Sequence, residues 1–166
     1  TTESHPNKTY KFRNGQSVSI CGYQDEGNNT EQFQISEFDI FDCKTGVSYV
    51  TYGAVEQVII EEKQDSLILF QLTNLPNGEN WSWNQVKIGK QVITTSNDSI
   101  IAGSSSPFYQ KTGYDKLIAK QYLNQITLNK STITEWESVI LKLTFLTLED
   151  NKEARQLLDN FPTAFD

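Results

Sequence analysis

Residues 55–72 read VEQVIIEEKQDSLILFQL, and this stretch decides the fold. Two runs rich in Val, Ile, Leu and Phe, 55–62 and 66–72, flank the polar triplet Lys63-Gln64-Asp65. Short runs of β-branched and other large apolar residues are typical of strands, and a tight polar connection between two of them is typical of a hairpin. The stretch therefore predicts two antiparallel neighbours in a sheet.

Similar runs lie on both sides of this hairpin. Turn residues separate them, above all Pro76-Asn77-Gly78, whose glycine suits a backbone of positive φ. Within 31–43 the apolar positions change phase at Ser36-Glu37, which predicts a β-bulge. Successive hairpins predict an antiparallel meander. The predicted strands are Gln16–Tyr23, Glu31–Cys43, Gly46–Tyr52, Val55–Glu62, Ser66–Leu72, Asn80–Ile88 and Lys90–Thr95.

After residue 103 the pattern becomes helical. A stripe of apolar residues predicts a helix over Tyr114–Thr127, with Asp115 adding negative charge to its first turn. A second helix is predicted to begin at the capping-box pair Thr134 and Glu137. The alternation in 141–145 leaves a strand open as the alternative over 139–148.

A short amphipathic helix is predicted over Asp150–Leu158, with Ala154, Leu157 and Leu158 facing inward. The predicted fold is thus α+β. An antiparallel sheet, a meander that is sandwich-like or barrel-like, fills the N-terminal two thirds of the chain, and two or three C-terminal α-helices pack on it.

The length of 166 residues fits a single folded domain. Residues 1–14 are polar and without periodicity, which predicts a flexible leader. The remainder, 15–166, is predicted to be one α+β domain, with a β-rich part over 15–102, a Gly- and Ser-rich loop over 103–113 and a helical part over 114–166.

The chain contains two cysteines, Cys21 and Cys43, and both lie in predicted strands. Neighbouring strands can bring two such residues together, so we expect a disulfide. The loop of about twenty residues that it would close corresponds to about 3 kcal/mol of stability in the chain-entropy model. Two buried thiols are the alternative, because cysteine is among the most buried residue types.

The only histidine, His5, lies in the predicted leader. A Ser-His-Asp or Cys-His catalytic group is therefore excluded from the folded part, and a zinc site would need mainly carboxylates, which is unusual. Nor do the glycines form a nucleotide-binding loop. The composition predicts a protein that is not an enzyme, with no metal and no other cofactor.

The formal net charge is −7, and the chain has only two arginines, Arg13 and Arg155. Nucleic acid is disfavoured as a partner, because phosphate binding needs clustered basic residues. A basic protein partner suits the negative charge, which would speed its encounter. The longest aliphatic or aromatic run is 67–70, far shorter than the roughly 20 residues of a membrane helix, so no transmembrane segment is expected.

The sequence begins at Thr1 and contains no methionine, which is typical of a processed or trimmed chain. We therefore expect an exported protein, in the bacterial periplasm or at the cell surface. A lipid anchor upstream of Thr1 is compatible with this expectation.

Trp81 and Trp83 are the main candidates for a binding surface. Residues two apart on a strand point to the same side, so the two rings would form an aromatic shelf, with Asn80 and Asn84 offering hydrogen bonds beside it. Such a shelf suits a sugar ring or a protein hot spot. The alternative is that both rings pack under the helices.

Acidic residues form two further candidate groups, Asp39 with Asp42 and Glu61 with Glu62. They could contact a basic partner, or two of them could act as a carboxylate pair in a hydrolase. A solvated strand face is the structural alternative.

Together these features predict a non-catalytic exported binding protein. An inhibitor or immunity-type protein that neutralises a partner enzyme or toxin by protein contact is the leading hypothesis. A carbohydrate or small-ligand binding module built on Trp81 and Trp83 is the first alternative, and a carboxylate-dependent hydrolase is the second.

Overall fold

The computed structural model describes residues 7–24, 33–78, 80–128 and 133–161. The fold is α+β, as predicted, with the strands first in the chain and the helices last. The strands are β1 (Asn7–Lys11), β2 (Ser17–Gln24), β3 (Phe33–Asp42), β4 (Ser48–Lys63), β5 (Ser66–Asn77), β6 (Ser82–Ser96), β7 (Ser99–Ala102) and β8 (Ser106–Pro107). The helices are α1 (Lys116–Leu128), α2 (Trp136–Leu148) and α3 (Lys152–Asp159).

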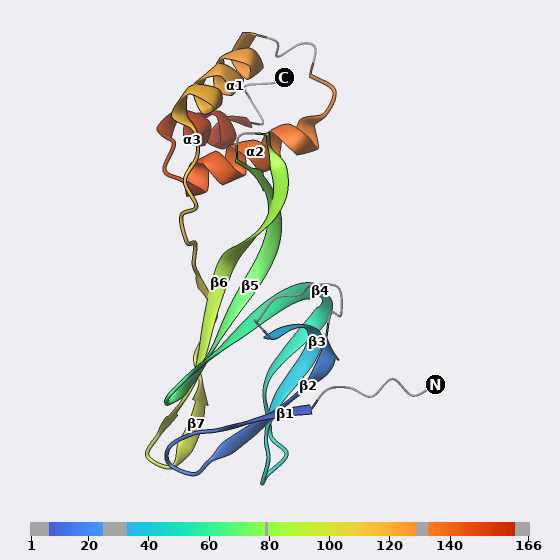
Figure 1. Ribbon diagram of the computed structural model, residues 1–166, viewed down its shortest axis with the longest axis vertical. Helices are drawn as coiled ribbons and strands as arrows, with labels where there is room; N and C mark the ends of the chain where they lie inside the picture. The colour runs from blue at the N-terminus through green and yellow to red at the C-terminus, as the bar shows by residue number, and fades with distance from the viewer. Residues whose placement is uncertain (1–6, 25–32, 79, 129–132, 162–166) are drawn as a thin grey trace, which may run out of the picture. The chain divides into compact units, whose positions relative to one another are not determined.

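The strands form the predicted antiparallel meander. Each strand from β1 to β7 is hydrogen-bonded to the next one in the sequence (Figure 1). The short strand β8 pairs with β6. The hairpin predicted at Lys63-Gln64-Asp65 is confirmed, because Lys63 pairs with Ser66. The predicted bulge is confirmed too: the β3–β4 register shifts between Ser36 and Phe38, and Glu37 adopts a φ of 45°.

Two pairs of predicted strands are single strands in the structure. The runs 46–52 and 55–62 join into β4, which begins only at Ser48, and the runs 80–88 and 90–95 join into β6, which begins only at Ser82. Gly89 continues β6 and pairs with Pro107 on β8. A Cβ atom at Gly89 would lie 2.8 Å from Oε1 of Gln71, so this glycine leaves room for the Gln71 side chain and does not mark a turn.

The chain divides into two compact units, which are described separately below. Unit 1 comprises residues 1–73 and 87–108, and unit 2 comprises residues 74–86 and 109–166. The last boundary between the units, between 108 and 109, lies inside the loop predicted over 103–113. Residues 74–86 form the end of the β5–β6 hairpin, so this hairpin contributes to both units.

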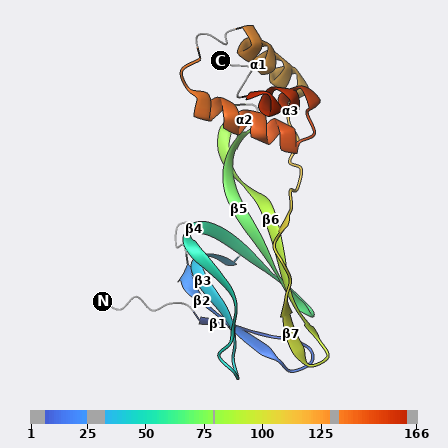
Figure 2. The ribbon, with the colours of Figure 1, turned by 180° about the vertical axis from the view of Figure 1, so that it is seen from behind.

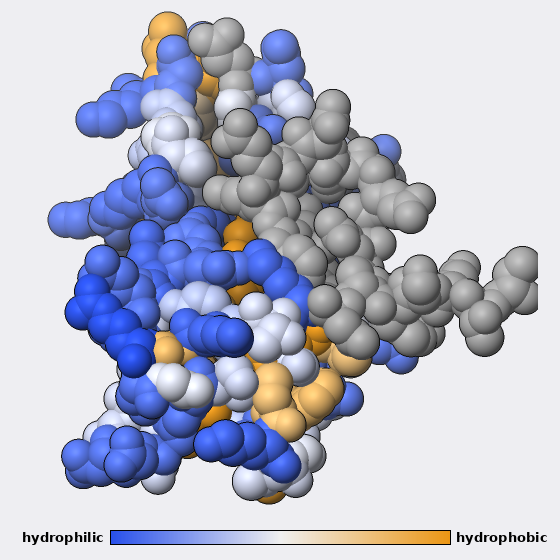
Figure 3. All heavy atoms as spheres, turned by 60° about the horizontal axis from the view of Figure 1, so that its bottom comes forward, coloured by the Kyte–Doolittle hydropathy of each residue, from blue (hydrophilic) through white to orange (hydrophobic). Residues whose placement is uncertain are grey.

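Unit 1 is built around one hydrophobic core. Its most buried side chains come from β2 to β6, so the sheet folds over a single cluster, as predicted for a sandwich-like or barrel-like arrangement. Figure 2 shows β4 as the strand that joins the β1–β3 part of the sheet to the part that follows. On the face shown in Figure 3, hydrophilic residues cover most of the coloured surface, and hydrophobic residues form only small patches.

The predicted flexible leader needs correction. Residues 7–11 form β1, and Tyr10 and Phe12 are buried in the core of unit 1. The Tyr10 hydroxyl donates a hydrogen bond to the carbonyl of Lys63. The prediction rested on the many polar residues of this segment and gave no weight to these two aromatic residues. They are spaced by two and therefore face the same side of the strand and its continuation. Residues 1–6, with His5, lie outside the described residues.

The predicted disulfide is wrong in this structure, where the two cysteines are not joined. The β2–β3 register places Cys43 beside Ser17, whose carbonyl accepts a hydrogen bond of 3.2 Å from the Cys43 amide. Cys21 lies four residues further along β2, opposite Asp39, and four residues of strand span about 13 Å. Bonded cysteines need Cα atoms within about 7 Å of each other.

Unit 2 packs the three helices with the end of the hairpin. Its buried residues include Leu75 and Val86 of the hairpin, Leu123 of α1, and Leu143 and Phe145 of α2. Figure 1 shows α1, α2 and α3 gathered at the tip of β5 and β6. The helix predicted over 114–127 is confirmed as α1, and the short helix predicted over 150–158 as α3.

The second predicted helix is confirmed as α2, which rules out a strand over 139–148. Its predicted capping box is wrong, however. The N-cap residue is Glu135, and it makes no side-chain capping hydrogen bond. The other two helices, α1 and α3, do have side-chain N-caps. The Asp115 carboxylate accepts a hydrogen bond from the Leu117 amide (2.8 Å), and Asn151 Oδ1 accepts one from the Ala154 amide (3.0 Å).

Candidate functional site

Trp81 does not belong to a strand. It precedes β6 in the hairpin turn with a φ of 51°, and its ring packs on Tyr122 and Phe145, with centroid distances of 4.9 and 6.4 Å. The ammonium group of Lys142 lies 5.5 Å from the Trp81 ring centroid. Trp81 therefore belongs to the aromatic core of unit 2.

Trp83 has the opposite environment. It lies on β6 and is 60% exposed. It lines a groove of about 410 Å³ together with residues from the start of α2, and Trp81 is not among its lining residues. We call this the Trp83 groove; its other lining residues are Thr134, Glu135, Trp136, Glu137, Ser138 and Leu141. The predicted two-ring shelf therefore does not form, because the strand alternation on which it depended begins only at Ser82.

The two asparagines also have different roles. Asn84 donates hydrogen bonds from its amide to Asn77 Oδ1 and to the carbonyl of Ser82, the latter at 3.1 Å. Because Asn77 is buried, these bonds hold the hairpin turn together. Asn80 lies exposed in the turn itself.

The acidic candidates of β3 are held by local contacts. Asp42 accepts hydrogen bonds from the amides of Lys44 (2.7 Å) and Thr45 (2.8 Å), an arrangement typical of a turn between strands. The Thr45 and Lys44 amides hold the pKa of Asp42 below its usual value. Asp39 accepts from the hydroxyls of Thr51 and Ser48 on β4.

The acidic candidates of β4 are ion-paired. Glu61 lies 2.7 Å from the Lys87 ammonium and 3.9 Å from that of Lys63, and Glu62 pairs with Lys8. Each of the four predicted acidic residues thus has its own separate set of contacts. Among the described residues no group of three or more His, Cys, Asp or Glu side chains is placed to hold a metal ion.

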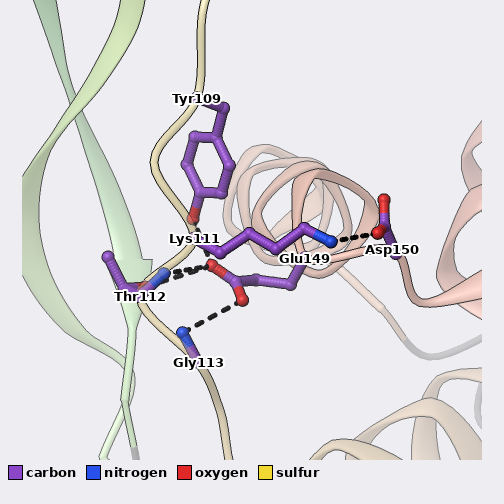
Figure 4. Close-up of polar contacts among 6 residues, drawn as sticks. All are labelled: Tyr109, Lys111, Thr112, Gly113, Glu149 and Asp150. Carbon is purple, nitrogen blue, oxygen red and sulfur yellow. Dashed lines mark hydrogen bonds and ion pairs between the residues drawn. The ribbon is translucent and has the colours of Figure 1, made fainter.

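Glu149 is a conspicuous polar residue that the sequence did not single out. It ends α2, is only 9% exposed and accepts four hydrogen bonds from the segment before α1 (Figure 4). The donors are the Tyr109 hydroxyl (2.6 Å), the Thr112 amide (2.8 Å), the Thr112 hydroxyl (3.2 Å) and the Gly113 amide (3.0 Å). The neighbouring Asp150 pairs with Lys111.

The hydrogen bonds fix the charge state of Glu149. Burial by itself would raise the pKa of this carboxyl, but the bonds from Tyr109, Thr112 and Gly113 outweigh burial and lower the pKa. By accepting these four hydrogen bonds, the Glu149 carboxylate holds residues 109–113 against the end of α2. It is a structural contact of unit 2, and a general acid would instead need a raised pKa.

The Trp83 groove remains the best candidate site. Because Thr134 and Glu137 do not form a capping box, their side chains are left at the groove. Glu135 and Glu137 are exposed, and neither is ion-paired with any residue that the structure describes. The groove thus combines an exposed indole, apolar surface from Leu141 and two carboxylates.

No family model, no curated protein and no solved structure matches this chain. Over the described ranges, no helix has both the length and the apolar character needed to cross a membrane.

Proposed function

We propose that this chain is a non-catalytic binding protein that engages a basic, partly apolar segment of another protein in the Trp83 groove. An inhibitor or immunity-type protein that neutralises an enzyme or toxin is the concrete form of this proposal. The observation that carries it is the 60% exposure of Trp83 beside Trp136 and Leu141.

The aromatic part of the groove supports a protein contact. Tryptophan is enriched among interface hot spots because it combines a large apolar area with one hydrogen-bond donor. Trp136 is half-buried and packs edge-on against Phe161, with 5.4 Å between ring centroids, so one wall of the groove is fixed. A fixed wall lowers the entropic cost of binding.

The charge of the groove supports a basic partner. Glu135 and Glu137 line it, and none of the described residues that line it is basic. A lysine or arginine side chain could therefore contact a carboxylate and lie over the Trp83 ring at the same time. The formal net charge of −7 would steer such a partner toward the protein.

Three carboxyl groups outside the groove are poor candidates for a general acid. A general acid needs a raised pKa, whereas the pKa values of Asp42, Glu149 and Asp150 are lowered.

The proposal predicts selective binding of a cationic peptide. Calorimetric titration with a peptide of alternating Lys and Leu should show saturable binding, and a Glu–Leu peptide of the same length should bind far more weakly. Trp83→Ala should weaken binding by about tenfold or more, as for a hot-spot residue. Glu135→Gln with Glu137→Gln should weaken binding and flatten its salt dependence.

Leu117→Ala is the matched control, because Leu117 is another exposed large apolar residue of unit 2, at 66%, and lies outside the groove. This variant should bind the peptide like the unaltered protein. Equal losses in Trp83→Ala and Leu117→Ala, or equal binding of the two peptides, would contradict the proposal.

A further inference from the structure

A second pocket, in unit 1, has a different chemistry. It measures about 420 Å³ and lies over β4, β5 and β6, with Ser105 from the segment between β7 and β8 at its side. Its polar lining residues are Tyr49, Thr51, Tyr52, Gln71, Gln91 and Ser105. None of the described lining residues is charged, so the pocket offers hydroxyl groups, carboxamides and two tyrosine rings.

Several of these groups are held in place before any ligand arrives. The Tyr52 hydroxyl donates to Gln91 Oε1 at 3.0 Å, and Gln91 Nε2 donates to the carbonyl of Gly103 at 2.8 Å. The Tyr52 ring stacks on Phe38, with 5.0 Å between centroids and 19° between planes. Groups that are already ordered lose little entropy on binding, which favours affinity and selectivity.

Gln71 supplies a hydrogen-bonding group that is not used internally. Its side chain lies over the backbone of Gly89, where a Cβ atom would come within 2.8 Å of Gln71 Oε1. Gln71 is half-buried, and its carboxamide makes no hydrogen bond with any other described residue. Half-buried amides usually find a partner in the protein or in the solvent, so a ligand that replaces solvent here gains both a donor and an acceptor.

We propose that this pocket binds an uncharged carbohydrate. Sugar hydroxyls both donate and accept hydrogen bonds, so they can bond to both ends of the Gln71 carboxamide and donate to the tyrosine hydroxyl oxygens, whose protons go to Asp42 and Gln91. The C–H faces of a sugar ring suit aromatic rings. The Thr51 hydroxyl, which donates to Asp39, can still accept a bond from such a ligand. A charged ligand would lose hydration without a counter-charge among the lining residues. This proposal is independent of the Trp83 groove.

The test is NMR titration of the ¹⁵N-labelled protein with neutral hexasaccharides of glucose, mannose and xylose in their common linkages. At least one should cause saturable shifts at residues 49–52, 71, 91 and 105. Gln71→Ala should weaken that binding by roughly three- to tenfold, as expected for one neutral hydrogen bond, without lowering the melting temperature. Gly89→Ala should also weaken it, because the new methyl group displaces the Gln71 carboxamide.

Gln64→Ala is the control, since it removes the same carboxamide from the exposed β4–β5 turn. It should leave the affinity unchanged. The proposal is overturned if no neutral saccharide of the panel shifts these residues, or if the shifts map to the Trp83 groove instead. It is equally overturned if a galacturonate oligomer or an uncharged Gly-Ala peptide binds as tightly as the best neutral sugar.

Discussion

At the scale of single residues, two side chains that are close in sequence have very different environments. Trp81 and Trp83 are two residues apart, yet Trp81 packs in the core of unit 2 and Trp83 is exposed. The positive φ of Trp81 is the cause, because a residue in that conformation leaves the strand pattern and turns its side chain elsewhere. Local backbone conformation therefore decides which indole can meet a partner.

Glu149 provides a prediction at this scale. Glu149→Gln keeps the shape of the side chain but removes the charge and leaves one carbonyl oxygen to receive the donors of residues 109–113. We expect the free energy of unfolding of unit 2 to fall by about 2 kcal/mol, the range for hydrogen bonds to a charged group. Chemical denaturation followed by circular dichroism measures this change. Asp150→Asn is the control and should have little effect, because the Lys111–Asp150 pair is exposed.

The same residue predicts a pH dependence. The folded-state pKa of Glu149 lies below its usual value of 4.5, so its stabilising contribution is present above that pH and is lost as the pH falls through the folded-state pKa. Carboxyl groups titrate roughly between pH 5 and pH 2. Over this range the unaltered protein should therefore lose more stability than the Glu149→Gln variant does. Parallel loss in both proteins would show that Glu149 does not titrate differently on unfolding.

At the scale of elements, hydrophobic periodicity predicted the strands and helices that bury a clear apolar face. The hairpin of β4 and β5, the bulge at Glu37 and the three helices follow from such patterns. The three short strands β1, β7 and β8, of two to five residues, were not predicted. The predicted strands were also divided at Gly53 and Gly89, although both glycines lie within single strands. Pairing with neighbours that are distant in sequence holds these strands together, and a local pattern does not show it.

Helix capping gives a prediction at this scale. Asp115→Ala and Asn151→Ala remove observed side-chain caps and should each lower stability by about 1 kcal/mol, whereas Thr134→Ala should not, because its capping box is absent. Thermal melting followed at 222 nm, the usual helix signal, compares the three variants. If Thr134→Ala lost as much stability as Asp115→Ala, this would show that Thr134 caps α2 and would contradict the prediction.

At the scale of the whole molecule, each unit has its own hydrophobic core. Leu69 is fully buried in unit 1 and Leu143 in unit 2. Substitution of either by Ala should cost about 2–5 kcal/mol. Hydrogen exchange should show the effect mainly in the unit that carries the substitution: in the strands for Leu69→Ala and in the helices for Leu143→Ala. Uniform loss of protection over both units would mean that they unfold as one.

The candidate site could be predicted only in part. Trp83 was a candidate because of its spacing of two from Trp81, and the structure leaves it exposed on β6. Its neighbours in the groove, 134–138, lie some fifty residues later, and no local pattern connects them to β6. Glu149 was missed for the same reason: its donors are in residues 109–113, and an acidic residue at a helix end is ordinary in sequence.

The division of unit 2 between two chain segments has a consequence for the order of folding. Residues 74–86 are separated from 109–166 by strands that belong to unit 1. Bringing two distant segments together costs entropy, and the intervening strands of unit 1 must be synthesised before the helices can reach the hairpin end. During synthesis, the hairpin end would emerge with Leu75 and Trp81 uncovered until the helices follow. The end of the β5–β6 hairpin should thus form first, and the helices of unit 2 should assemble on it afterwards.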